Sequence, residues 1–188
     1  SGIRDIIIPS SVNRIGSNTF EYSNLQSVRF GDGVMSIGSA CFANSSLQNV
    51  LIGDKLTEIP ESCFEGCTYL SDIHIGSNVK TIADKAFANC TSLESISIPG
   101  SVTSIGTAQY CSTSDNTYAG TSLPFYNCTS LKSIRFEDGN ATLSLGSAYY
   151  NNGPSDYYYT YGKGLFYYSP LEEVYLGRNV QYIDYSTS

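Results

Sequence analysis

The chain has 188 residues and a formal net charge of −7, from 10 basic and 17 acidic side chains. This surplus of negative charge argues against a nucleic-acid backbone or an anionic membrane surface as the partner. No apolar run approaches the roughly 20 residues of a membrane span, so we expect no membrane insertion in this segment. Few basic residues, no Trp and a surface rich in Tyr, Ser and Asn are typical of exported proteins.

A repeat of 22 or 23 residues runs through the chain. A typical unit opens on Leu or Ile, continues with apolar residues at alternate positions, and ends on Val-x-x-Ile and a Phe. The units begin at Ile3, Leu25, Leu47, Leu70, Leu93, Leu131 and Leu171. An apolar pattern with a fixed period of this length is typical of a solenoid, because one unit buries its apolar side chains only against its neighbours. The sequence therefore predicts an α/β repeat solenoid, rich in β structure, with about seven units.

The offsets within a unit predict its local structure. In unit five, Ile96 and Ile98 alternate with serines, so a strand should point the two isoleucines to one face and the serines to the other. The Pro-Gly-Ser stretch at 99–101 ends that strand. The second half of a unit is clearest in unit four, where residues 79–82 predict a second short strand. Residues 84–88 of the same unit are good helix formers and predict a brief helical turn. Stacked units then form a parallel sheet.

Units five and six are longer than the others. Leu93 and Leu131 are 38 residues apart instead of 23, an insertion of 15, and Leu131 and Leu171 are 40 apart, an insertion of 17. The insertions lie at about 107–123 and 147–164, and the second is rich in Tyr. Because the pattern is in register from the start and unit seven ends before its Phe, we expect a fragment of a longer repeat array.

The repeat resembles the BspA-type leucine-rich repeat, most clearly in LESISIPGSVTSIG at 93–106 and KAFANCTSL at 85–93. The resemblance implies one leucine-rich-repeat domain over 1–188, a right-handed superhelix with a parallel sheet, short second strands and short helical turns. It also implies a surface or secreted protein, of a family linked to adhesion to host matrix proteins and to other cells. The family has no catalytic residues, so we expect no enzyme and no cofactor. The FEDG stretch of unit six and both insertions depart from the family pattern.

The six cysteines of an exported protein could form three disulfides or remain free. Most of them occupy equivalent repeat positions, namely Cys67, Cys90 and Cys128 in one column and Cys41 and Cys63 in another. Stacked side chains point in parallel directions instead of facing each other, which is unsuitable for a disulfide. We therefore expect small, buried, free thiols. Cys111 lies alone in the first insertion, where it could be exposed.

The sequence offers no metal or catalytic site. His74 is the only histidine and no C-x-x-C pair occurs, which argues against zinc and against Ser/His/Asp catalysis. His74 lies beside Asp72 on the outward side of a strand, where a solvated residue is expected. The Gly-Asp-Gly at 31–33 and Glu-Asp-Gly at 137–139 do not recur with a calcium-binding period, so we interpret them as turns.

The outward strand residues should form the concave face of the solenoid. Ile7, Leu51 and Tyr175 are apolar or aromatic among polar neighbours, which suits protein contact. They could equally be ordinary strand formers. The candidate contact residues on this face are Arg29, Leu51, Asp72, His74, Arg135 and Tyr175.

The Tyr-rich insertion is the second candidate binding surface. Tyr157, Tyr158, Tyr159 and Tyr161 are accompanied by Gly, Ser and Asn, a composition typical of recognition loops. The alternative is that these rings fold back over the solenoid and cover its core.

Our leading hypothesis is a non-catalytic surface or secreted repeat protein that mediates protein–protein contact or adhesion, located outside the cell or on its surface. Its partner would be a surface protein of a host or neighbouring cell, or a glycan. The alternatives are a carbohydrate-binding module, in which Tyr stacks on sugar rings, and a structural spacer that presents other domains.

Overall fold

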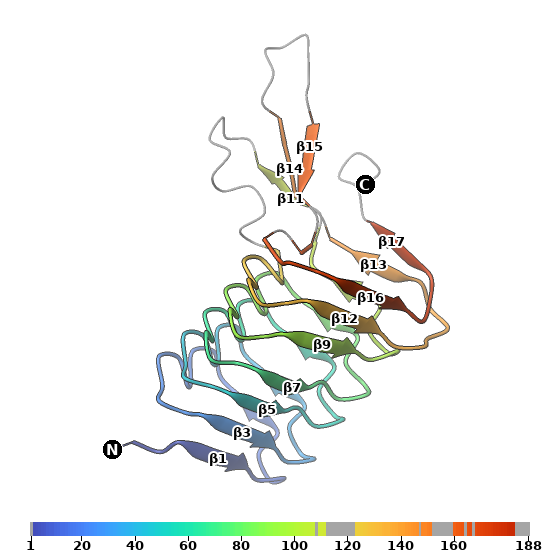
Figure 1. Cartoon of the computed structure of the whole chain (residues 1–188). Helices are drawn as coiled ribbons and strands as arrows, with labels where there is room; N and C mark the ends of the chain where they lie inside the picture. Colours follow the sequence, from blue (N-terminus) through green and yellow to red (C-terminus); the bar gives the residue numbers. More distant parts are fainter. Residues whose placement is uncertain are drawn as a thin grey trace.

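The computed structural model describes residues 2–107, 109–111, 123–146, 148–151, 160–163, 165–166 and 168–182. These residues form β-strands and turns, with consecutive coils stacked along one direction from β1 to β16 (Figure 1). No helix long and apolar enough to cross a membrane occurs among them. The β-rich repeat solenoid expected from the sequence is confirmed.

Long strands form one wall of the stack. They are β1 (Asp5–Ile8), β3 (Ser27–Phe30), β5 (Asn49–Leu51), β7 (Asp72–His74), β9 (Ser95–Ile98), β12 (Ser133–Phe136) and β16 (Glu173–Leu176). All pairs are parallel and join equivalent repeat positions, as Val28 and Val50 do, or Ile96 and Ile134. The repeat therefore predicts the register of the sheet, since every coil must place the same side chains in the core.

This wall is divided between β7 and β9. One sheet has the order β1-β3-β5-β7 and the other β9-β12-β16. Pro99 follows β9 and has no N–H group, whereas Gly31, Glu137 and Gly177 at the same position donate to the preceding coil, at 2.8, 3.0 and 2.8 Å. Proline thus removes one of the hydrogen bonds that would join the two sheets. We call this boundary the seam.

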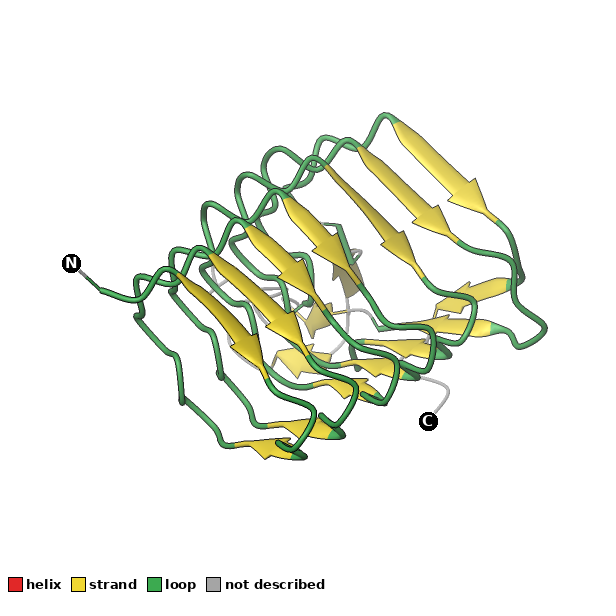
Figure 2. Ribbon diagram, turned by 90° about the horizontal axis from the view of Figure 1, so that it is seen from below, coloured by secondary structure: helices red, strands yellow, loops and turns green. Residues whose placement is uncertain are grey.

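Short strands form the second wall, as expected (Figure 2). They are β2 (Arg14–Ile15), β4 (Ser36–Ile37), β6 (Glu58–Ile59), β8 (Thr81–Ile82), β10 (Ser104–Ile105), β13 (Leu143–Leu145) and β17 (Val180–Tyr182). They make a sheet of β2 and β4 and another with the order β6-β8-β10-β13-β17. The second sheet bridges units four and five, so the coils stay in contact across the seam.

The expectation of short helical turns is wrong for the part of the chain that the structure describes. Residues on both sides of Phe20, Phe42, Phe64 and Phe87 have positive φ, among them Ser62 and Lys85 (both 56°) and Asn89 (62°). This conformation breaks a helix and directs alternate N–H groups to the next coil, as in the bond from Phe64 to the Ala86 carbonyl (2.9 Å). Stacking therefore overrides the helix propensity of these short segments.

The core contains a column of phenylalanine rings. Neighbouring centroids along the column are 5.2, 5.6, 5.5, 5.4 and 5.5 Å apart for Phe20, Phe42, Phe64, Phe87, Phe125 and Phe166. The apolar residues of the repeat surround this column as one continuous cluster. One Phe per unit thus packs coil against coil from the first unit to the sixth.

The two insertions meet in a separate three-stranded sheet. β11 (Gln109–Cys111) from the first insertion pairs in parallel with β14 (Ala148–Asn151) from the second, and β15 (Thr160–Lys163) pairs antiparallel with β14. The sheet projects from the stack at the top of Figure 1. The insertions are separate stretches of the sequence, but in the structure their backbones pair in one sheet.

Candidate functional site

The outward residues of the long strands form one surface, which we call the strand face. Its members are exposed or half-buried: Asp5, Ile7, Ser27, Arg29, Asn49, Leu51, Asp72, His74, Ser95, Ser97, Ser133, Arg135, Glu173 and Tyr175. Parallel pairing in register arranges them in two rows, because side chains alternate along each strand. The structure thus brings together the six candidate contact residues that the sequence predicted here.

The first sheet of the strand face exposes large apolar groups. Ile7 is 73% exposed and Leu51 is 38% exposed, and Arg29 lies between them in the same row. Apolar groups beside a guanidinium are typical of protein contact surfaces. This part of the strand face therefore combines apolar area with one positive charge.

The second sheet holds a preformed cation–aromatic pair. The guanidinium carbon of Arg135 lies 3.7 Å from the centre of the Tyr175 ring. The Tyr175 hydroxyl donates to Oδ1 of Asp138 at 3.2 Å. The two contacts fix the ring, and the guanidinium covers one of its faces. That face of Tyr175 is therefore closed to stacking on a sugar.

A small polar hollow of about 120 Å3 lies at the seam. Its lining is Ile73, His74, Ile75, Ser77, Ser97, Pro99 and Glu137. The Ser97 hydroxyl donates to the Glu137 carboxylate at 2.7 Å. The nearby Asp54 accepts hydrogen bonds from the N–H and hydroxyl of Ser77, at 2.7 and 2.9 Å, and these bonds lower its pKa. The hollow therefore offers the Glu137 carboxylate to a hydrogen-bond donor.

The described residues do not assemble a metal site. No group of three or more His, Cys, Asp or Glu side chains among them lies close enough to hold an ion. His74 is exposed on the strand face and belongs to the seam hollow.

The Tyr-rich insertion is described only in part. Tyr161 lies on β15, in register with Tyr150 on β14. Tyr157, Tyr158 and Tyr159 lie outside the described residues. Their role in binding stays a prediction.

Sequence reasoning missed Arg178. Its side chain is buried, and its guanidinium donates to the carbonyls of Pro99 (2.7 Å), Gly100 (2.9 Å) and Val102. Burial lowers the pKa of Arg178, and the charge of Glu137 opposes this shift. No repeat position signals such a contact, because the donor and the acceptors lie 76 to 79 residues apart in the chain.

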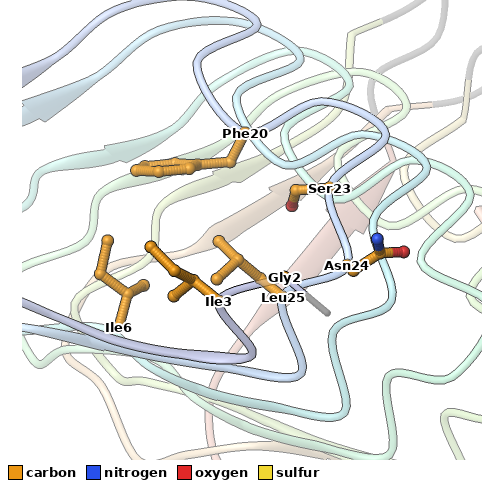
Figure 3. Close-up of a pocket in the computed structure, with 7 residues that line it drawn as sticks. All are labelled: Gly2, Ile3, Ile6, Phe20, Ser23, Asn24 and Leu25. Carbon is orange, nitrogen blue, oxygen red and sulfur yellow. The ribbon is translucent and has the colours of Figure 1, made fainter.

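An apolar hollow of about 280 Å3 lies at the N-terminal end of the stack (Figure 3). Ile3, Ile6, Leu25 and Phe20 line it, and the buried Ser23 hydroxyl beside them has no hydrogen-bond partner. In later coils the residue at the Ser23 position donates to the Phe carbonyl of the preceding coil, as Cys67 does. The hollow is therefore the surface on which this repeat stacks coils, not a separate ligand site.

Five cysteines are buried free thiols, as expected: Cys41, Cys63, Cys67, Cys90 and Cys128. The thiols of Cys67, Cys90 and Cys128 donate to Phe carbonyls of the preceding coil at 3.1, 3.2 and 3.2 Å. The side chain of Cys111 lies outside the description.

Burial raises the pKa of these thiols. The pKa of Cys67 rises to about 11 and those of Cys41 and Cys128 to about 12, from an ordinary value of 9.0, because burial penalises the thiolate. The stability linked to each thiol proton is fully present below the unfolded-state pKa. It is lost as the pH rises towards the folded-state pKa, since the unfolded chain ionises first.

We expect Cys90→Ser to weaken this pH dependence. A Ser hydroxyl can still donate to the Phe64 carbonyl, as the Cys90 thiol does at 3.2 Å, but does not ionise. Between about pH 9 and pH 10 the free energy of unfolding of the variant should fall less than that of the wild type, by up to about 1.4 kcal/mol per pH unit. Urea unfolding at several pH values measures the difference. Equal slopes would contradict the assignment of Cys90 as a buried neutral thiol.

Comparisons with known proteins agree with this architecture. The profile of a family described as a BspA type leucine rich repeat region matches residues 1–117 and 117–187, in six copies. A leucine rich cell surface protein from Faecalibacterium prausnitzii is 39% identical with a TM-score of 0.59, over 69% of this chain and 31% of that chain. This chain thus spans about a third of that protein's length.

A second solved structure, the pneumococcal vaccine antigen PcpA, is 17% identical with a TM-score of 0.53, over 98% of this chain and 69% of that chain. At this identity the likeness concerns the fold alone. A search of curated proteins found no match.

Proposed function

Because this chain belongs to the BspA-type leucine-rich repeat family, we propose that it is a non-catalytic repeat protein that binds another protein at a cell surface through its strand face. The cell-surface description of the Faecalibacterium prausnitzii protein supports the location. The partner would be a surface protein of a host or neighbouring cell. The observation that carries the proposal is the strand face, on which outward side chains from consecutive coils lie in register along each of its two sheets.

The rigidity and the chemistry of the side chains on the strand face favour binding of a protein. Side chains on paired strands are spaced about 4.8 Å apart and fixed by the ladder, so little ordering entropy is lost when a partner docks. Leu51 offers apolar area, and the Arg135–Tyr175 pair offers a rigid aromatic and cationic anchor. Glu137 in the seam hollow can accept a hydrogen bond from a Lys or Arg of the partner. The net charge of −7 favours a partner with basic patches.

We expect the double variant Leu51→Lys with Tyr175→Ala to lose at least tenfold in affinity, because it adds a charge to the apolar region and removes the aromatic anchor. Binding of the purified chain to intact cells and to a panel of purified matrix proteins measures the change. Met35→Lys is the matched control, since Met35 is 56% exposed and lies outside the strand face. Met35→Lys should bind as the wild type does.

The same experiment separates the alternatives. If the double variant and a chain lacking 147–164 both bind as the wild type does, the segment is a spacer. A carbohydrate module using Tyr175 is disfavoured, because Arg135 covers one face of that ring.

A further inference from the structure

A second polar hollow lies beside the strand face, where three consecutive coils enter β3, β5 and β7. It has a volume of about 250 Å3 and is lined by Gln26, Ser46, Gln48 and Tyr69. Tyr69 is 61% exposed, so its ring is accessible to a ligand. The hollow is separate from the seam hollow and shares no residue with it.

The lining residues depart from the repeat. The position that follows the first Leu or Ile of each unit holds, in order, Arg4, Gln26, Gln48, Ser71, Glu94, Lys132 and Glu172. Two neutral amides are adjacent only at this hollow. The position that precedes the Leu holds Asn24, Ser46, Tyr69, Ser92, Ser130 and Pro170 in units two to seven. Tyr69 is the one aromatic residue in that column, so neither feature is required by the fold.

The walls of the hollow are rigid, but their side chains are free to bind. The Gln26 carbonyl accepts from the N–H groups of Gln48 (2.8 Å) and Asn49 (3.1 Å), and the Gln48 carbonyl accepts from Ser71 and Asp72 (both 3.1 Å). The backbone carbonyls of Gln26 and Gln48 are thus fully paired by hydrogen bonds between coils. Within the part of the chain that the structure describes, the two side-chain amides and the hydroxyls of Ser46 and Tyr69 have no hydrogen-bond partner.

We propose that this hollow is a binding site for a neutral saccharide. Each Gln amide presents a donor and an acceptor side by side, which suits adjacent hydroxyls of a sugar ring. The exposed ring of Tyr69 can pack against the C–H face of the sugar. No lining residue is charged, so an ionic ligand finds no counter-charge, and an apolar ligand would leave the amides unpaired.

The size of the hollow restricts the ligand. Pockets for drug-sized molecules usually have volumes of about 300–1,000 Å3, so a hollow of about 250 Å3 accommodates one sugar ring and not an extended chain. An open site with a few hydrogen bonds should bind a monosaccharide with a millimolar dissociation constant. This site goes beyond the proposed protein contact, because it takes another ligand class at other residues.

Saturation-transfer NMR of the probes, together with proton–nitrogen correlation spectra of the isotope-labelled full chain, tests the proposal. The probes are the methyl glycosides of glucose, galactose, mannose, N-acetylglucosamine and N-acetylgalactosamine, with the methyl glycoside of N-acetylneuraminic acid as the charged probe. We expect at least one neutral glycoside to bind and to shift the side-chain amide signals of Gln26 and Gln48. The charged probe should bind at least tenfold more weakly.

Tyr69→Ala and Gln48→Ala should each weaken binding of that glycoside at least tenfold. Both residues are exposed, so the variants should keep the melting temperature of the wild type. Tyr22→Ala is the matched control, because Tyr22 is 73% exposed and lies outside the hollow. The proposal is overturned if no neutral glycoside binds, if Tyr69→Ala binds as the wild type does, or if the charged probe binds more tightly.

Discussion

Phe64→Ala should lower the free energy of unfolding by about 3–5 kcal/mol. The Phe64 ring is fully buried and stacks on Phe42 and Phe87, at 5.6 and 5.5 Å, with interplanar angles of 8° and 7°. Ala at this position removes both ring contacts and leaves a cavity between three coils. Because each coil is stabilised mainly by its neighbours, the cavity should also uncouple the units on either side. Urea unfolding followed by circular dichroism measures the loss.

Phe20→Ala is the matched control for the column. Phe20 is half-buried and stacks on Phe42 at 5.2 Å, at the end of the column. The same substitution should therefore cost only about 1–2 kcal/mol, since less buried area is lost and solvent reaches the site. Equal losses for the two variants would contradict the view that the column couples the coils.

Arg178→Met should lower the free energy of unfolding by about 3 kcal/mol. The guanidinium of Arg178 donates hydrogen bonds to the carbonyls of Pro99, Gly100 and Val102, and Met would leave these acceptors unpaired. Each unpaired buried acceptor destabilises the fold by about 1–3 kcal/mol, and repacking or water that bonds to the carbonyls reduces the total loss. Amide exchange should accelerate most in units five to seven, where these contacts lie.

Two further variants test the cause. Arg178→Lys keeps the positive charge but not the planar fork of donors, so it should retain less than half of the stabilisation. Arg135→Met removes an exposed arginine from the neighbouring strand face and should cost less than about 1 kcal/mol. A loss of similar size in Arg178→Met and Arg135→Met would show that the carbonyl contacts contribute little.

The repeat, the register of the strands and the membership of the strand face all follow from the amino-acid sequence. Each apolar position recurs at a fixed offset, so stacking in register is the one arrangement that buries all of them. The same argument placed Arg29, Leu51 and Arg135 on one surface and predicted that Cys67 and its equivalents are free thiols, and the structure agrees on both. These features follow from periodicity alone.

The places where the pattern is interrupted become visible in the folded chain and not in the sequence. Residues 84–88 form a turn that is hydrogen-bonded to a neighbouring coil, although their composition favours a helix. The short sequence 84–88 carries no information on that neighbouring coil, so it could not predict these bonds. The seam at Pro99 could not be predicted, because the sequence does not show which backbone N–H groups bond to which neighbouring strand. The pairing of β11 with β14 joins two insertions that lie far apart in the chain.

The Arg178 contacts and the hollow at Tyr69 have the same origin. Arg178 donates to carbonyls 76 to 79 residues earlier, and Tyr69 lines the same hollow as Gln26, which lies two coils away. In a solenoid such groups become neighbours only once the coils are stacked. The periodic residues therefore define the scaffold, whereas its individual sites arise from nonperiodic residues that stacking brings together.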